Sequence, residues 1–378
     1  MTYLENPFTP SFGEVPDHLA GRHDIVRRFD RAFSARLRRP ELTTILTGAR
    51  GTGKTTLLSC IARRAESSGW VCAEVTCGEG MLDDIEIRSR HAAAHLMPSL
   101  DRVRITSVGV SDVASVGFEF VPDKDNWRRR MELILDDLDK TETGLLITVD
   151  EVNGSLDEMI RLATVYQHFV REGRKVSLVM AGLPHNVSSL IKDKTVSFLR
   201  RAQRETLGRI DDFEVRDALK KTIEENGRTI GGSGLEHAVE AVDGFPFMLQ
   251  LVGYRIWDES IESQAISDDD VERGIAAARS EMESRILGAT YNELSDGDIA
   301  YVNAMLEDEG DSKTGDVAAR LGVSTSLAAQ YRRRLIDAGV IGGRRRGVGS
   351  TSRISANSSK GGGEPDGCSR SLHRLLLP

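Results

Sequence analysis

Residues 48–55 read Gly-Ala-Arg-Gly-Thr-Gly-Lys-Thr, the phosphate-binding pattern G-x-x-x-x-G-K-[ST]. Glycines let a tight loop turn several backbone N–H groups toward one anion, because no Cβ blocks the dihedral angles required. The apolar residues 42–47 before this phosphate loop fit a buried strand, and residues 55–64 fit a helix, so a bound phosphate would lie at a helix N-terminus. We expect a nucleoside triphosphate to contact Gly48, Ala49, Arg50, Gly51, Thr52, Gly53, Lys54, Thr55 and Thr56.

Residues 145–151, Leu-Leu-Ile-Thr-Val-Asp-Glu, fit a short buried strand that ends in two carboxylates. The strands of a parallel sheet end at one common edge, so this pair can face the phosphate loop. We expect Thr55 and Asp150 to hold Mg²⁺. Lys54 would reach the β- and γ-phosphates, and Glu151 would orient the attacking water as the catalytic base. The alternative interpretation is a solvated acidic pair at a strand end.

Other strands and helices alternate along the first half of the chain. Residues 71–77 and 176–181 fit buried strands, and short β-like pieces lie around residues 103–121. Apolar residues at helical spacing predict helices near 83–98, from 127 to 138, and at 156–171. This alternation predicts an α/β fold with a parallel sheet.

Length and composition describe an ordinary globular protein of two or three domains. The chain has 378 residues, of which 39% are hydrophobic and 29% charged. No run of 18 apolar residues and no signal-peptide pattern is present, so we expect no membrane partner and a cytoplasmic location. The four cysteines show no metal-ligand spacing with histidines, and we expect Cys72 and Cys77 to be reduced core residues.

Charge separates a C-terminal segment from the rest of the chain. The whole chain has a net charge of −8, but residues 313–346 hold eight basic and two acidic side chains. Residues 316–323 fit a helix followed by a glycine turn, and residues 325–337 fit a second helix capped by Ser324, a helix-turn-helix pattern. Such a basic face can bind double-stranded DNA. The expected DNA contacts are Thr325, Ser326, Gln330, Arg332, Arg333, Arg334, Arg344, Arg345 and Arg346.

The order of these motifs resembles that of AAA+ P-loop ATPases, in particular origin-recognition-type initiators and STAND-type NTPases. The resemblance covers roughly residues 5–348. It implies an AAA+ core at 1–210, a helical lid at 211–290 and a winged helix-turn-helix at 291–348, with ATP and Mg²⁺ as ligands. Gly21 and Arg22 look like the segment that lies near the adenine in this family, although a turn before a helix fits them equally well.

Three further positions bear on how such an ATPase would work. The strand after the acidic one ends Ala181-Gly182-Leu183-Pro184, without the polar side chain usual in AAA+ enzymes. Gly244-Phe245-Pro246 is similar to the lid motif of STAND-type proteins, which implies that Pro246 lies near the nucleotide; a helix N-terminus is the alternative. Both departures predict slow hydrolysis. Arg200 or Arg201 is the candidate arginine finger toward a neighbouring subunit of a homo-oligomer, with a basic helix face as the alternative.

The last segment, residues 349–378, is rich in Ser and Gly, and we expect it to be disordered. It lacks the returning strand of a winged helix, and a shifted reading frame in the gene is our hypothesis for this. Three functions remain open. The protein is an ATP switch that controls DNA engagement, a STAND-type signalling switch without DNA binding, or a helper ATPase that acts on a partner protein of a mobile element.

Overall fold

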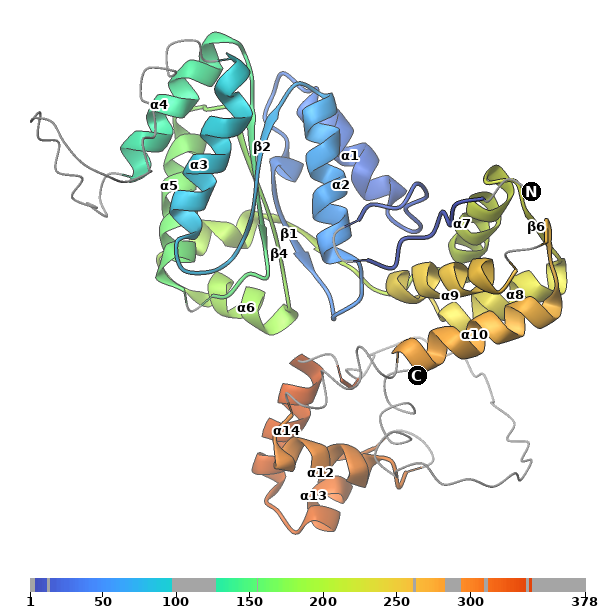
Figure 1. The fold of residues 1–378 in the computed structure, drawn as a ribbon. Helices are drawn as coiled ribbons and strands as arrows, with labels where there is room; N and C mark the ends of the chain where they lie inside the picture. Colours follow the sequence, from blue (N-terminus) through green and yellow to red (C-terminus); the bar gives the residue numbers. More distant parts are fainter. Residues whose placement is uncertain are drawn as a thin grey trace, which may run out of the picture. The chain divides into compact units, whose positions relative to one another are not determined.

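The computed structural model describes most of the chain, in two compact units (Figure 1). One unit spans Ser11–Gly208, and the other combines Met1–Pro10 with Arg209–Pro378. The described residues are 4–11, 14–96, 127–154, 156–260, 263–282, 294–308, 312–337 and 340–341. The β-like pieces expected around 103–121, the returning wing strand and the tail at 349–378 lie outside these residues.

A five-stranded parallel sheet with the order β2-β3-β4-β1-β5 forms the first unit. Its strands are β1 Thr43–Thr47, β2 Val71–Thr76, β3 Leu145–Asp150, β4 Val176–Gly182 and β5 Gln203–Thr206. The first four were predicted from their apolar runs. Strand β5 was not, because its sequence Gln-Arg-Glu-Thr has no apolar residue and only one of its sides pairs, with β1. The α/β parallel-sheet prediction is confirmed.

Helices cover both faces of this sheet (Figure 1). One face packs on α1 His23–Phe33 and α2 Lys54–Ser67. The other packs on α3 Met81–Ala93, α4 Trp127–Lys140, α5 Asp157–Arg171 and α6 Pro184–Lys192. Side chains alternate between the faces: Leu46 and Leu146 join the first core, whereas Ile45 and Ile147 join the second. Over the described residues, helices therefore bury both faces of the sheet. A ligand can reach the sheet at the ends of its strands.

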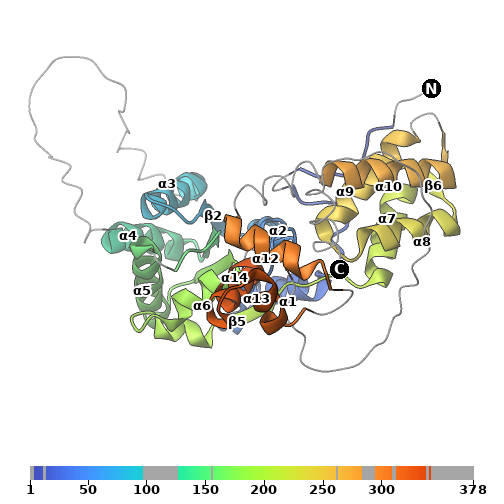
Figure 2. The same cartoon turned by 90° about the horizontal axis from the view of Figure 1, so that it is seen from below.

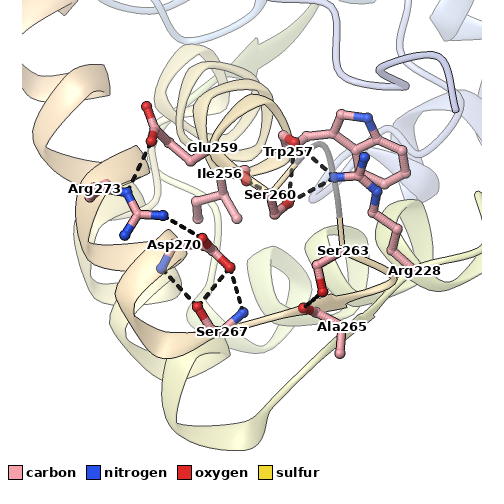
Figure 3. A network of polar contacts seen from close by, with 10 residues as sticks. All are labelled: Arg228, Ile256, Trp257, Glu259, Ser260, Ser263, Ala265, Ser267, Asp270 and Arg273. Atoms are coloured by element: carbon pink, nitrogen blue, oxygen red, sulfur yellow. Dashed lines mark hydrogen bonds and ion pairs between the residues drawn. The ribbon is translucent and has the colours of Figure 1, made fainter. Parts of the chain in front are cut away.

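Four helices of the second unit lie at the residues where the sequence led us to expect a lid. They are α7 Asp212–Glu225, α8 Gly232–Val242, α9 Pro246–Glu259 and α10 Asp268–Met282. Two short parallel strands, β6 Thr229–Ile230 and β7 Ala265–Ile266, were not predicted. Arg228, only 2% exposed, donates to the Trp257 carbonyl and to Ser260 Oγ and lies 4.0 Å from the Trp257 ring centre, which fixes the end of α9 (Figure 3).

The N-terminal segment packs on α9 and belongs to the unit of these helices, whereas the expected core at 1–210 included it. Asn6 Nδ2 donates to the Tyr254 carbonyl at 3.0 Å and to an Asp258 carboxylate oxygen at 2.9 Å. Phe8 is 1% exposed, and a Cβ at Gly253 would stand 2.3 Å from its ring. The close approach of Phe8 to the α9 backbone therefore requires the glycine.

Three further helices, α12 Asp296–Met305, α13 Thr314–Leu321 and α14 Thr325–Asp337, form a small bundle in which they lie side by side (Figure 2). Tyr301, Val317 and Leu335 are buried in its centre. Gly322 links α13 to α14 with φ +65°, a left-handed turn that favours glycine. The two helices and the glycine turn expected from the sequence are present, with α14 at the predicted bounds, and a winged helix stays a prediction. Among the described residues, none of the helices is long and apolar enough to cross a membrane.

Candidate nucleotide-binding site

The phosphate loop joins β1 to α2, and its shape depends on glycine. Gly51 and Gly53 have φ of +77° and +80°, a region that L side chains rarely adopt. A Cβ at Gly48 would stand 2.5 Å from Thr52 Oγ1 and 2.7 Å from the Leu207 carbonyl oxygen. Helix α2 begins at Lys54, directly after the loop. The loop therefore presents the N-terminus of α2, where backbone N–H groups attract an anion.

Lys54 is folded back onto the loop. Its Nζ donates to the carbonyl oxygens of Gly48 at 3.0 Å and Ala49 at 2.7 Å. Burial lowers the pKa of Lys54, and the nearby Asp150 carboxylate opposes this shift. Phosphate oxygens can replace the two carbonyls as acceptors for the ammonium group without breaking an ion pair.

Thr55 and Asp150 meet at the same edge of the sheet. Thr55 Oγ1 donates to Asp150 Oδ2 at 2.5 Å, although β4 separates β1 from β3 in the sheet. A hydroxyl and a carboxylate are oxygen ligands that suit Mg²⁺, which usually takes its remaining ligands from water and substrate phosphates. The part of the chain that the structure describes holds no group of three or more His, Cys, Asp or Glu side chains arranged for a metal ion. The pair therefore fits a magnesium ion that is shared with a triphosphate.

Glu151 follows Asp150 and is exposed at the same edge. Its φ is +53°, a left-handed conformation uncommon for a residue with a side chain. Its N–H donates to Asp150 Oδ1 at 2.8 Å. Such backbone strain persists only where neighbouring contacts hold it, and it clusters at functional sites.

The end of β4 carries no polar side chain, as the sequence indicated. Gly182 is the last residue of this strand, and a Cβ there would lie 3.2 Å from Val152 Cβ and 3.3 Å from the Val152 carbonyl oxygen. Val152 is fully buried in this place. The residue that follows Glu151 therefore fills the space beside Gly182.

Gly21 and Arg22 lie beside the base of the phosphate loop. Leu207 N–H donates to the Thr47 carbonyl at 2.6 Å, so the chain after β5 runs next to Gly48. Arg22 Nη2 donates to the carbonyl of the following residue, Gly208, at 2.6 Å. Gly21 has φ +70°. This location agrees with a contact to adenine, which stays a prediction. The alternative, a turn before α1, is also present in the structure.

Arg200 and Arg201 lie far from the phosphate loop along the strand direction. Both are exposed, in a short 3-10 helix, Ser197–Arg201, that precedes β5. Parallel strands begin at one edge of the sheet and end at the other, so these arginines lie at the edge opposite the loop. They cannot serve the phosphate loop of their own subunit from there. Pro246 is the first residue of α9 in the other unit, which matches the helix N-terminus alternative, and its contact with nucleotide stays a prediction.

The DNA-contact candidates divide into two groups. Thr325, Ser326, Gln330 and Arg333 are exposed along α14 as expected. Arg334 differs, because its guanidinium binds Asp298 Oδ1 at 2.8 Å, and Asp298 is 5% exposed at the N-terminus of α12. The reason is a capping box, Ser295-x-x-Asp298, whose buried carboxylate needs a positive partner.

Arg332 is also engaged within this bundle. It is half-buried and donates to the Ser312 carbonyl and to Thr314 Oγ1. Arg344, Arg345 and Arg346 lie outside the described residues. The sequence pattern Ser295-Asp296-Gly297-Asp298 was a readable signal for the cap, and it was missed.

Comparison with known proteins agrees with this geometry. Residues 18–174 match the family described as AAA ATPase domain, and residues 284–349 match a domain of unknown function, DUF8462. The fold is similar to that of the Walker-type ATPase PABY2304 of Pyrococcus abyssi, with 14% identity over 85% of this chain and 91% of that chain and a TM-score of 0.59. The ADP form of the Aeropyrum pernix ORC2 protein is also similar, with 13% identity over 88% and 89% of the two chains and a TM-score of 0.51. No curated protein matches the chain significantly.

Proposed function

We propose that this protein, whose residues 18–174 match the AAA ATPase domain family, binds ATP with Mg²⁺ and hydrolyses it slowly, as a cytoplasmic switch that controls DNA engagement by its helix-turn-helix. The single observation that carries the ATPase part is the contact of Thr55 with Asp150 beside Lys54. It brings the anion-binding and acidic motifs together at one sheet edge. The free thiols of Cys60, Cys72 and Cys77 fit a reducing compartment.

The chemistry follows from these positions. The phosphate loop binds the β- and γ-phosphates, Lys54 neutralises them, and Thr55 with Asp150 would hold Mg²⁺. The ion would polarise the γ-phosphoryl group and neutralise developing charge. Glu151, exposed next to Asp150, orients the attacking water.

The proposal of slow hydrolysis is supported by the missing polar side chain at the end of β4. Over its described length, β4 offers no polar side chain at its end, so one aid in placing the water is absent. An arginine finger at Arg200 or Arg201 would have to come from a neighbouring subunit. We propose that ATP is held for long periods until such a subunit or a partner protein completes the site.

A switch also needs a route from the nucleotide to the lid, and residues 207–210 supply a candidate. In the first unit, Leu207 pairs with Thr47 directly before the phosphate loop. In the second unit, Ile210 N–H donates to the Gly244 carbonyl at 2.7 Å, directly before Pro246. Gly208 and Arg209 join the two contacts along the chain.

The proposed DNA binding is supported by the exposed face of α14. Thr325, Ser326, Gln330 and Arg333 offer hydrogen-bond donors and a positive charge on a second helix of the kind that enters a major groove. The pairing of Arg334 with Asp298 favours the second candidate, a signalling switch whose helix-turn-helix binds protein. A helper ATPase for a mobile element remains a third proposal.

Hydrolysis is tested with Glu151→Gln in the full chain. We expect ATP affinity within about twofold of the wild type and a turnover rate reduced by roughly 100-fold or more, because the general base is lost. Glu142→Gln is the matched control, since Glu142 is another exposed glutamate with positive φ, +54°, outside the site. Normal turnover by Glu151→Gln would refute the assigned base.

DNA engagement is tested by gel shifts at two salt concentrations, with ATP, with ADP and without nucleotide. Phosphate contacts predict a steep loss of affinity as salt rises. The switch predicts that ATP and ADP give different affinities. Absence of binding at low salt in all three nucleotide states would leave the signalling switch as the better candidate.

A further inference from the structure

Hydrogen bonds hold the chain where it leaves β3, in the segment 150–153 that we call the Glu151 turn. Glu151 N–H donates to Asp150 Oδ1 at 2.8 Å. Val152 N–H donates to the Ala181 carbonyl of β4 at 2.8 Å. Asn153 N–H donates to the Sγ atom of Cys77, at the end of β2, at 3.3 Å. The turn is thus tied on both sides to neighbouring strands.

Glu151 requires such ties, because its φ of +53° is unfavourable for a residue with a Cβ. Without them, the peptide would relax to an ordinary conformation and the carboxylate would point elsewhere. Val152 is the tie on the β4 side, fully buried beside Gly182. The same packing leaves no room for a side chain at the end of β4.

Cys77 forms hydrogen bonds with the turn both before and after Glu151. Its backbone N–H donates to the Asp150 carbonyl at 2.9 Å, and its thiol sulfur accepts from the Asn153 N–H. The side chain is half-buried. A thiol sulfur is a weak acceptor, which makes it a weak tie in a strained turn.

We propose that Cys77 is a positioning residue for ATP hydrolysis: its thiol, together with the docking of Val152 against Gly182, holds Glu151 in the orientation that activates water. This inference rests on the proposed ATPase function. It also explains how the site orients Glu151 although β4 supplies no polar side chain.

The experiment compares Cys77→Ala, Cys77→Ser and the matched control Cys60→Ala, since Cys60 is another half-buried cysteine and lies on α2, outside the Glu151 turn. For Cys77→Ala we expect the single-turnover hydrolysis rate to fall roughly fivefold, the loss of about one neutral hydrogen bond, with the ATP dissociation constant within about twofold. Cys77→Ser keeps an acceptor and should restore most of the rate. Cys60→Ala should resemble the wild type.

A second pair of variants tests the β4 side of the turn. The Cβ of Gly182→Ala would press on Val152 at 3.2 Å and should slow hydrolysis without weakening ATP binding. Gly78→Ala is its control, because a Cβ there meets nothing within 4 Å. Equal rates for the two variants would count against the docking of Val152.

Amide hydrogen exchange separates the proposal from a general loss of structure. Cys77→Ala should speed exchange in the peptide that contains Asn153, while the peptides of α2 and β1 stay protected. The inference is overturned if Cys77→Ala hydrolyses ATP at the wild-type rate, if binding and rate fall together, or if serine does not rescue. Should the wild-type chain fail to hydrolyse ATP, the proposed function fails, and exchange at Asn153 still decides whether the thiol holds the turn.

Discussion

The phosphate loop and the three-helix bundle both carry basic side chains that the sequence assigns to phosphate binding, yet the two regions use them differently. Within the described residues, Lys54 donates to the carbonyls of Gly48 and Ala49, which are neutral acceptors. Arg334 instead pairs with the buried carboxylate of Asp298. A phosphate can take the place of a carbonyl at little cost, whereas displacing Arg334 would leave a buried charge unpaired. Whether a basic side chain is available to a ligand therefore depends on the group that it already binds, a neutral carbonyl for Lys54 and a buried carboxylate for Arg334.

The largest effect that this comparison predicts is the loss of nucleotide binding in Lys54→Ala. Removing the ammonium group should weaken ATP affinity by roughly 100-fold, since charge-assisted bonds to phosphate are lost. Thermal stability should change little without nucleotide, because the hydrogen bonds of this side chain among the described residues go to two neutral carbonyls of its own loop. Titration with a fluorescent ATP analogue measures the affinity, with Lys194→Ala, an exposed lysine of the same unit, as control. A large drop in melting temperature without nucleotide would show that Lys54 is a structural residue.

The next largest effect is expected in the three-helix bundle, which Asp298→Ala should destabilise. The variant removes the N3 carboxylate of the α12 capping box, which accepts from the Ser295 N–H, and the partner of Arg334, and we expect a loss of about 2 kcal/mol in the stability of the bundle. Amide exchange of α12 in the full chain measures it. Asp296→Ala, an exposed residue in the first turn of the same helix, is the control and should cost much less. Equal effects would mean that Arg334 is not committed to Asp298.

The sequence predicted those parts of the fold that depend on neighbours along the chain. The phosphate loop was readable because its glycines meet a local backbone requirement, and the four apolar strands were readable because both faces of the sheet are buried. Strand β5 was not, because an edge strand can be polar. The left-handed Glu151 was not readable either, because Cys77 and Ala181, distant in sequence, hold it in place.

A smaller effect separates Arg333 from its neighbour in DNA binding. If α14 contacts phosphates, Arg333→Ala should lower the slope of log affinity against log salt by about one unit, as expected for one lost phosphate contact. Arg334→Ala should leave that slope nearly unchanged and instead speed amide exchange in α12. Gel shifts across a salt series measure both slopes. Equal slopes for both variants would show that the ion pair with Asp298 does not withhold Arg334 from DNA.

The smallest effect is a pH dependence within the same bundle. The Arg320 guanidinium beside Asp308 lowers the pKa of that carboxyl to about 2, from an ordinary value of 3.8. Because the folded-state pKa is depressed, the stabilisation from this pair is complete above pH 3.8 and is lost as the pH falls through about 2. Exchange or unfolding measurements on wild type and Asp308→Asn should therefore differ at pH 5 and converge toward pH 2. A difference that persists at pH 2 would mean that Asp308 acts through hydrogen bonds that survive protonation. In that case the ion pair with Asp308 would not make Arg320 unavailable to a phosphate ligand, in contrast to the ion pair of Arg334 with Asp298.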